Sequence, residues 1–312
     1  ASFNNELGLP LTLVNAPADT EIAVLEMGAR GIGHIAELCR TGRPTLGVVT
    51  RVAGAHTELF GSLDGVAQGK GELVESLPAS GTAVLNADDQ RVLAMRTRTS
   101  ASVLTYGTVT GADITVSNLR LDPAMRATFT ATTPWGSAEV RLALAGAHMA
   151  LNAAAAIAAG GAVGVELDEL VAGLEGASSS AWRMEVSTAT DGATIINDAY
   201  NANPTSVRAA LAALVAADGV TKTAVLATMA ELGPEHAAEH AAVARETVAA
   251  GVRLIAVGAA DYGVVAEHVA SIDEAVDRLG SLGPDDVVLV KGSRVAELER
   301  LATILIGSAP GN

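Results

Sequence analysis

Polar side chains that directly follow apolar runs are the first candidates for chemistry in this chain, because ligands of open α/β sheets gather at the carboxyl ends of the strands. Glu26 follows the apolar run Ile22–Leu25. A carboxylate there could hold Mg²⁺, a hard cation that takes one or two carboxylates together with substrate phosphates. A carboxylate that caps the next helix would explain the same position equally well.

Two further candidates follow the next apolar run, Thr45–Thr50. His56 stands in a Gly-Ala-His-Thr loop, where it could ligate a metal or transfer protons, although a loop histidine is more often simply solvated. Lys70 follows a Gly-Val-Ala-Gln-Gly segment that resembles a phosphate loop only superficially. Its glycines are too closely spaced, Gly71 stands where Ser or Thr is needed, and the pattern is helical, so we exclude a P-loop there.

A dense polar cluster, Asn197–Pro204, lies between a predicted strand and a predicted helix. Turn formation and helix capping explain part of it, since Asn and Asp bond their own backbone and Pro suits a first helical turn. So many polar side chains in one turn nevertheless favour a ligand site. Asp198, directly after the strand, could accept hydrogen bonds from ribose hydroxyls.

A second strand-to-helix junction carries Lys291, Gly292, Ser293 and Arg294. Backbone N–H groups at a helix start, together with two cations, would favour an anion. A capping serine between two solvated basic residues is the equally weighted alternative.

The elements that must position these residues alternate between strands and helices in the first half of the chain. Apolar runs predict strands over Ile22–Met27, Thr45–Thr50 and Thr82–Asn86, and a helix over Ser62–Leu77, an alternation typical of parallel βαβ units. From about 101 to 145, apolar residues recur at every second position, which predicts a small antiparallel insertion.

The second half repeats the alternation after a small polar stretch, Glu175–Ala181, that indicates a domain boundary. Helices over His148–Val163 and Leu167–Leu174 precede it. We therefore assign residues 1–177 to a first domain and 178–312 to a second, Rossmann-like domain. Its predicted strands are Ala193–Asp198, Lys222–Thr228, Arg253–Val257 and Val287–Lys291, and its predicted helices are Pro204–Ala217, Glu235–Ala250, Ile272–Leu279 and Val295–Leu305.

Composition supports a globular protein and excludes several classes. The chain has 312 residues, 49% hydrophobic and 18% charged, and a net charge of −15 without a basic run, which argues against general nucleic-acid or anionic-membrane binding. The uncharged stretch Gly146–Val165 predicts a buried helix rather than a membrane span. A lone cysteine, Cys39, and no leader pattern predict a reducing cytoplasm, and we expect a monomer.

Several of these segments, in their order along the chain, resemble the Mur ligases. The matching blocks are Ser2–Leu13, Val24–Gly28, Ala55–His56, Phe60–Ser62, Lys70–Glu72, Leu85–Asp89, Asp198–Pro204 and Val290–Arg294. The resemblance implies an α/β fold: part of a central P-loop-type ATPase domain with a small antiparallel insertion, then a C-terminal Rossmann-like ligase domain. In the family, a UDP-binding domain and a Gly-Lys-Thr phosphate loop precede the first block, so we expect an inactive fragment.

The resemblance also implies a reaction. The blocks are most similar to the branch that uses ATP and Mg²⁺ to join D-Ala-D-Ala to UDP-N-acetylmuramoyl-tripeptide in peptidoglycan synthesis, through an acyl phosphate. The protein would act by positioning and charge neutralisation. The alternatives are a folylpolyglutamate synthase-like ligase and a non-catalytic relative that binds peptidoglycan precursors.

The resemblance assigns roles to individual residues. Glu26, His56 and Lys70, the last as a carbamate, would be catalytic and would hold Mg²⁺. The nucleotide would contact Asn152, Arg183 and Asp198, and the substrates would contact Asn4, Asn5, Asn201, Asn203, Lys291 and Arg294. The chain departs from the family pattern at Arg51, Met149 and Ala227–Thr228, which bears on nucleotide affinity and on docking of the C-terminal domain.

Overall fold

The computed structural model describes residues 3–53, 60–178 and 180–307. The chain forms two compact units, of which the first comprises Ala1–Ser117, Thr130–Glu139 and Leu151–Ala172 and the second comprises Asn118–Phe129, Val140–Ala150 and Gly173–Asn312. Within the described residues, no helix is both long and apolar enough to cross a membrane.

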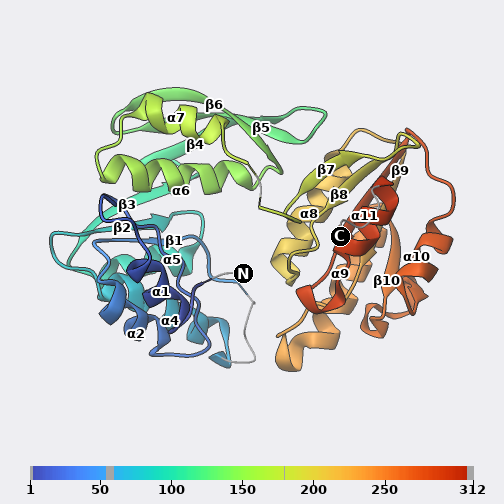
Figure 1. Cartoon of the computed structure of the whole chain (residues 1–312), viewed down its shortest axis with the longest axis horizontal. Helices are drawn as coiled ribbons and strands as arrows, with labels where there is room; N and C mark the ends of the chain where they lie inside the picture. Colours follow the sequence, from blue (N-terminus) through green and yellow to red (C-terminus); the bar gives the residue numbers. More distant parts are fainter. Residues whose placement is uncertain (1–2, 54–59, 179, 308–312) are drawn as a thin grey trace. The chain divides into compact units, whose positions relative to one another are not determined.

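The first sheet has its strands in sequence order (Figure 1). They are β1 (Leu46–Val49), β2 (Thr82–Asn86), β3 (Ser102–Gly107), β4 (Ile114–Leu121), β5 (Arg126–Thr133) and β6 (Gly136–Ala145). Strands β1 to β4 pair in parallel, whereas β5 and β6 are neighbours joined by two residues and must run antiparallel.

The strands predicted over Thr45–Thr50 and Thr82–Asn86 are confirmed as β1 and β2. The antiparallel insertion exists, but its predicted start near residue 101 was wrong, because β3 pairs in parallel with β2 and β4 pairs in parallel with β3. Alternating apolar residues mark a half-buried strand in either orientation, so the pattern could not show where the direction changes.

The helices of the first half are α1 (Gly8–Val14), α2 (His34–Gly42), α4 (Leu63–Glu75), α5 (Gln90–Ala94), the 3₁₀ turn η1 (Met95–Arg98), α6 (Met149–Ala162) and α7 (Leu167–Glu175). Helix α4 begins where Ser62 Oγ accepts the amide of Gly65 at 3.0 Å, and its Val66 and Val74 pack into a core with Leu85 of β2. The predicted helices over 62–77, 148–163 and 167–174 are therefore confirmed.

The predicted strand Ile22–Met27 was wrong, since this segment has no regular secondary structure. Its side chains still alternate: Leu25 and Met27 pack against a core of α1 and α2 residues, while Ile22 is 55% and Val24 is 92% exposed. The segment therefore has a strand-like pattern without the backbone hydrogen bonds of a sheet, because a strand needs a partner as well as a sequence.

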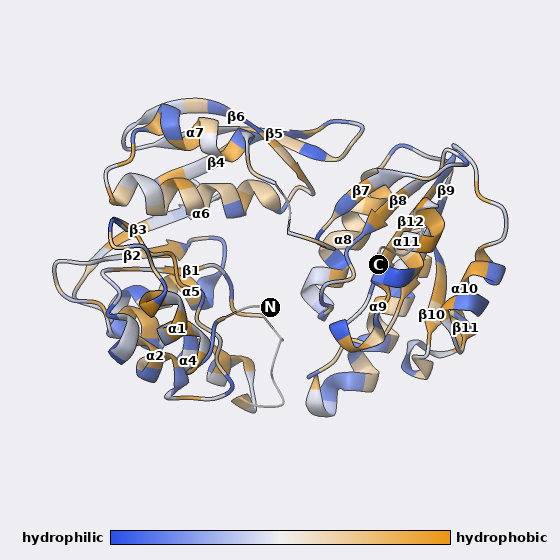
Figure 2. Cartoon of the chain, viewed as in Figure 1, coloured by the Kyte–Doolittle hydropathy of each residue, from blue (hydrophilic) through white to orange (hydrophobic). Residues whose placement is uncertain are grey.

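The second sheet has the order β11 (Glu267–Val269), β10 (Arg253–Val257), β9 (Thr221–Leu226), β12 (Asp286–Lys291), β8 (Thr194–Asn197), β7 (Glu185–Thr188). All pairs are parallel except β7 with β8. The four central strands, β10, β9, β12 and β8, each carry a buried apolar run, as Figure 2 shows and as cover on both faces requires, whereas the edge strands β7 and β11 are mostly polar. The predicted strands are confirmed, and β7 and β11 were not predicted.

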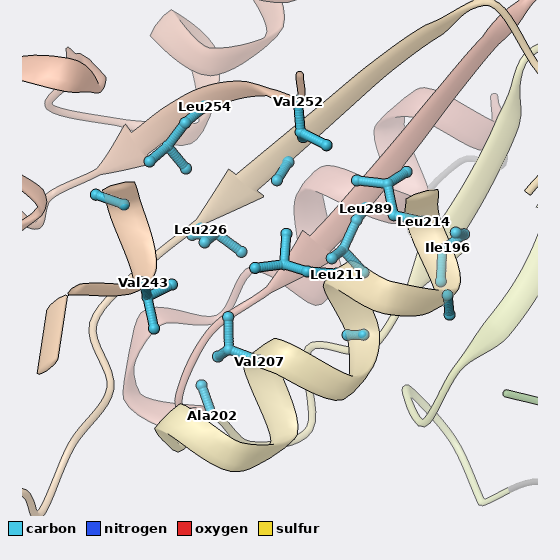
Figure 3. Packing of buried hydrophobic residues seen from close by; sticks show 14 of the residues in the cluster. Ile196, Ala202, Val207, Leu211, Leu214, Leu226, Val243, Val252, Leu254 and Leu289 are labelled. Carbon is cyan, nitrogen blue, oxygen red and sulfur yellow. The ribbon is translucent and has the colours of Figure 1, made fainter. Parts of the chain in front are cut away.

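Helices cover the two faces of the second sheet. One core contains residues of α8 (Pro204–Ala216) and α9 (His236–Ala249), and Figure 3 shows Val207, Leu211 and Val243 pointing toward Leu226 and Leu289. The other core contains residues of α10 (Ile272–Leu279) and α11 (Glu299–Ile306). Short 3₁₀ turns complete the unit: η2 (Gly233–Glu235), η3 (Ala260–Val265) and η4 (Arg294–Ala296). This is the predicted Rossmann-like arrangement.

Candidate functional site

The exits of β8, β12 and β9 lie next to one another in the second sheet, since these strands are neighbours and parallel. Lys291, the last residue of β12, is only 2% exposed, and its Nζ lies 2.5 Å from Asp198 Oδ2 and 2.8 Å from the carbonyl oxygen of Asn201. Burial lowers the pKa of the Lys291 ammonium, and the charge of Asp198 opposes this effect. Lys291 and Asp198 thus form a buried ion pair that joins two strand exits.

Asp198 also accepts the amide of Met184 through Oδ1 at 3.1 Å. A carboxylate has about four lone-pair positions, so Asp198, 14% exposed, keeps the capacity to accept a further hydroxyl. This capacity is compatible with the predicted hydrogen bond from ribose. The contacts that Asp198 makes in the structure hold Lys291 and the start of β7.

The two predicted asparagines of this turn serve the backbone. Asn203 caps α8: its Oδ1 accepts the Ser206 amide at 2.9 Å, and Ser206 Oγ accepts the Asn203 amide at 3.0 Å, a capping box. Asn201 Oδ1 accepts the amide of Ala202 at 2.8 Å while the residue is exposed. The helix-capping interpretation therefore holds for Asn203, and Asn201 keeps an amide nitrogen on the exposed side of the turn.

Two arginines place their guanidinium carbons over aromatic rings near the same strand exits. The Arg183 guanidinium is 3.9 Å from the ring centre of Tyr200, and that of Arg294 is 4.3 Å from the ring centre of Trp182. Arg294 also pairs with Glu299. Contact with a ring face restricts the orientations of a guanidinium, and a guanidinium is the side-chain group best suited to bind carboxylate or phosphate.

The predicted helix start at Lys291–Arg294 was wrong, because α11 begins at Glu299 and only the 3₁₀ turn η4 follows Arg294 directly. Ser293 makes no capping bond there. Instead its Oγ accepts the Ala230 amide at 2.8 Å and its own amide donates to the Thr228 carbonyl at 2.9 Å. Ser293, 3% exposed, therefore ties the exit of β12 to the exit of β9.

In the first unit, Asn4 and Glu26 lie together. Asn4 Nδ2 donates to Glu26 Oε1 at 2.9 Å, and the Asn4 carbonyl accepts the Gly28 amide at 2.7 Å. A Cβ on Gly28 would lie 3.0 Å from the Asn4 carboxamide, so a larger residue there would push the Asn4 side chain aside by a few tenths of an ångström. Glu26 is exposed, and Asn5, predicted beside Asn4, instead uses its Oδ1 to accept the amides of Leu7 and Gly8 at the start of α1.

Lys70 lies within α4, as its helical pattern predicted, so the absence of a P-loop at this position is confirmed. Its Nζ donates to the carbonyl oxygen of Arg51 at 2.6 Å. Burial lowers the pKa of the Lys70 amine, and Asp89 partly offsets the shift. Because the contact uses the backbone of Arg51, the unusual side chain at that position does not alter it.

Several residues that hold this region lie in the matching blocks Leu85–Asp89 and Lys70–Glu72 but were given no role from the sequence. Asn86 Nδ2 donates to the Thr50 carbonyl at 2.8 Å, and Asp89 Oδ2 accepts the Val52 amide at 2.8 Å, so the exit of β1 that holds Lys70 is fixed on both sides. Glu72, 7% exposed, accepts the amides of Gly33 at 2.5 Å and Ala36 at 3.0 Å at the start of α2. A carboxylate in an apolar helical pattern was the available signal for Glu72.

The remaining predicted residues are dispersed. His56 lies outside the described residues, and Asn152 is an exposed residue of α6. Among the residues that the structure describes, no group of three or more His, Cys, Asp or Glu side chains is arranged to hold a metal ion. Of the three residues of the predicted metal site, the structure therefore describes two: the carboxylate of Glu26 and the amine of Lys70.

Comparison with known proteins decides the family. The family model described as "Mur ligase middle domain" matches residues 1–160. The family model described as "Mur ligase, glutamate ligase domain" matches residues 182–294. This chain belongs to the Mur ligase family. The chain is 39% identical to the UDP-N-acetylmuramoyl-tripeptide–D-alanyl-D-alanine ligase of Mycobacterium tuberculosis over 98% of its own length. It spans 66% of that relative, just under two thirds.

Other Mur ligases agree with this assignment. The ligase of the same name from Escherichia coli is 35% identical, with 97% of this chain and 69% of the relative covered. The crystal structure of MurF from Acinetobacter baumannii superposes with a TM-score of 0.90 at 30% identity, covering 99% of this chain and 70% of that one. MurF from Thermotoga maritima, solved in complex with ADP, gives 0.86 at 25% identity over 97% and 71% of the chains.

Proposed function

We propose that this Mur ligase chain takes part in the ATP-dependent joining of D-Ala-D-Ala to UDP-N-acetylmuramoyl-tripeptide. The observation that carries the proposal is the 39% identity, across 98% of the chain, to a ligase of that name. In this reaction ATP phosphorylates the terminal carboxylate of the tripeptide. The amine of D-Ala-D-Ala then attacks the acyl carbon, phosphate leaves, and an amide remains. Because ATP is the phosphoryl donor, we place the activity in the cytoplasm.

We assign residues 1–177 to part of the ATPase domain and residues 178–312 to the ligase domain of this enzyme. In the first, Glu26, Lys70 and His56 would hold Mg²⁺. Glu26 fits a hard cation, since it is an exposed carboxylate kept in place by Asn4, whereas Lys70 would supply oxygen ligands only as a carbamate. When bound, Mg²⁺ neutralises phosphate charge.

Lys70 is suited to carbamylation. Its lowered pKa favours the neutral amine, whose lone pair can attack CO₂. The N–C bond forms, one N–H proton leaves to solvent, and the product carries two oxygens and a negative charge in place of the ammonium. Arg51, through its carbonyl oxygen, keeps the nitrogen at the exit of β1, where Asn86 and Asp89 fix the backbone.

In the ligase domain, Arg183 and Asp198 would contact the nucleotide, and the resemblance assigns a nucleotide contact to Asn152 of α6 as well. Arg183 is already oriented by Tyr200, and the Asp198 carboxylate by Lys291, so both side chains would bind without losing much rotamer freedom. Arg294, oriented by Trp182, and the exposed Asn201 would face the peptide substrates. Lys291 supports Asp198, and Asn203 caps α8 after the turn that carries Asn201. In the first unit, Asn4 supports Glu26 and Asn5 supports the start of α1.

The test uses the protein produced from its complete coding region, with ATP, Mg²⁺ and the two substrates. Phosphate release should require both UDP-N-acetylmuramoyl-tripeptide and D-Ala-D-Ala, and mass spectrometry should find the amide product. Release that instead depends on folate and glutamate, or none with any pair of substrates, would overturn the proposed function.

A matched pair of substitutions tests the role of Glu26. Glu26→Gln removes the charge but keeps the size and the bond from Asn4, and should lower the rate by about 100-fold or more if the carboxylate neutralises charge in the reaction. Glu21→Gln changes an exposed carboxylate of the same segment and should leave the rate unchanged. Equal rates for the two variants would remove Glu26 from the site while leaving the ligase assignment intact.

A further inference from the structure

The loop after β9, Ala227–Ala230, is bonded on two sides. On one side lies Ser293, whose backbone and hydroxyl bond Thr228 and Ala230 as described above. On the other side lie two side chains from α9 and η3. His240 Nε2 accepts the Met229 amide at 2.9 Å, and Tyr262 Oη donates to the Ala227 carbonyl at 2.9 Å.

His240 is fully buried, and both of its ring nitrogens are used. Nδ1 lies 2.7 Å from the His236 carbonyl oxygen, which can only accept, so Nδ1 carries the proton. Nε2 is then the acceptor that the Met229 amide requires. The two bonds fix a single neutral tautomer, and the edge of the Tyr262 ring contacts the imidazole with the ring centres 4.9 Å apart.

We propose that His240 is a positioning residue for the strand exits of the ligase domain: its neutral imidazole holds the Met229 amide, which places the β9 loop against Ser293 and so places the Lys291–Arg294 loop. The chain of contacts is continuous, since Ser293 Oγ also donates to the Ala202 carbonyl at 3.3 Å, in the turn that carries Asp198 and Asn201. The inference rests on the proposed function only where it treats these loops as part of a ligand site.

Loss of the acceptor has a local cost because the Met229 side of the loop is dry. Met229 and Ala227 are 0% and 1% exposed, so water cannot replace His240 as a partner for the amide. An unsatisfied buried donor is more costly than an absent bond. The loop must therefore shift or open when Nε2 is removed, whereas the interior of the sheet keeps its partners.

Protonation would have the same effect as removal, because a proton on Nε2 would face the Met229 N–H. Burial lowers the pKa of His240, which keeps the imidazole neutral at neutral pH. The groups that face it are His236, Glu239, Asp261 and Tyr262. The hydrogen bond to the His236 carbonyl and the two carboxylates raise the pKa of His240, whereas the charge of the His236 ring lowers it. The unfolded chain binds this proton first, so stability falls as pH drops below about 6.5.

The experiment measures amide hydrogen exchange by NMR in this chain. His240→Leu fills the space without an acceptor and should accelerate exchange at Met229 by about tenfold or more, with faster exchange at Ala230 and Ser293. His240→Gln can present an oxygen near the position of Nε2 and should restore protection. Thr247→Val, on the same helix, removes a buried hydroxyl that bonds Val243 rather than the loop, and serves as the control for general destabilisation.

The outcomes separate positioning from a merely structural role. Equal acceleration at Met229 and at Leu254 within β10, in both His240→Leu and Thr247→Val, would overturn the proposal. If His240→Leu fails to fold, the wild-type ¹⁵N spectrum decides: the proposal requires a protonated Nδ1, an unprotonated Nε2 and a Met229 amide that loses protection as His240 titrates. None of these readouts uses ligase turnover, so failure here and failure of the proposed function are distinguishable.

Discussion

The candidate residues of the two units differ in how they are held. In the second unit, Lys291, Ser293 and His240 are buried and bonded to neighbouring strand exits. In the first, Glu26 and Asn4 are partly or fully exposed and are joined by one side-chain bond. A motif residue can therefore be required for the fold, for the chemistry, or for both. The comparison predicts large losses of stability from the second set and small ones from the first.

The largest effect is expected at the buried ion pair. Lys291→Met should destabilise the chain by about 3–5 kcal/mol, because removal of one partner leaves the Asp198 carboxylate without the ammonium that compensates its burial. The measurement is the free energy of unfolding in urea. Lys222→Met, a partly buried lysine on the adjacent strand β9 that bonds the Val215 carbonyl, is the matched control and should cost about 1 kcal/mol or less.

A double variant shows whether the loss comes from the pair. Lys291→Met combined with Asp198→Asn removes both charges and should recover part of the stability, since replacing a buried pair is less costly than breaking it. If Lys291→Met costs no more than Lys222→Met, the buried pair contributes no more to stability than a single lysine bond on β9, and the large loss expected from the second unit is contradicted.

The sequence predicted the fold well where the pattern is unambiguous. Apolar runs without alternation predicted β8, β9, β10 and β12 correctly, because parallel strands covered by helices on both faces are apolar at successive positions. It failed for Ile22–Met27, whose pattern is strand-like but whose backbone has no sheet partner, and for the start of the antiparallel insertion, whose period is independent of strand direction.

The sequence predicted several residues of the candidate site from their types, but it did not predict the contacts that hold those residues in place. Lys291 and Asp198 were both named, but their pairing depends on β8 and β12 being neighbours, which no local pattern contains. The sequence left Ser293 as either part of an anion site or a helix cap, whereas it bonds loops 63 and 91 residues away in sequence. His240 and Glu72 are each one of several polar residues in their helices, and only the packed structure shows which backbone amides they satisfy.

A smaller effect is expected at Glu72, the buried carboxylate of the first unit. Glu72→Gln should destabilise the chain by about 1–3 kcal/mol. The substitution removes the negative charge of the carboxylate that accepts the Gly33 and Ala36 amides and complements the start of α2. Glu75→Gln, one turn later in α4, removes an exposed pair with Arg98 and should cost about 1 kcal/mol or less. The measurement is the free energy of unfolding of both variants in urea. Equal losses would contradict the expected difference between the buried and the exposed carboxylate.

The smallest effect on stability is expected at Asn4, and it defines the other end of the comparison. Asn4→Ala removes the bond to Glu26 but keeps the backbone bond from Gly28 to the Asn4 carbonyl, so unfolding should change by about 0.5 kcal/mol or less. Asn5→Ala removes the acceptor for two amides at the start of α1 and should cost about 1 kcal/mol. In the ligase assay the order should reverse, with Asn4→Ala slower than Asn5→Ala, because Asn4 orients Glu26. If Asn4→Ala lost as much stability as Asn5→Ala, the exposed pair Asn4–Glu26 would stabilise the fold, and the difference from the buried pair Lys291–Asp198 would be contradicted.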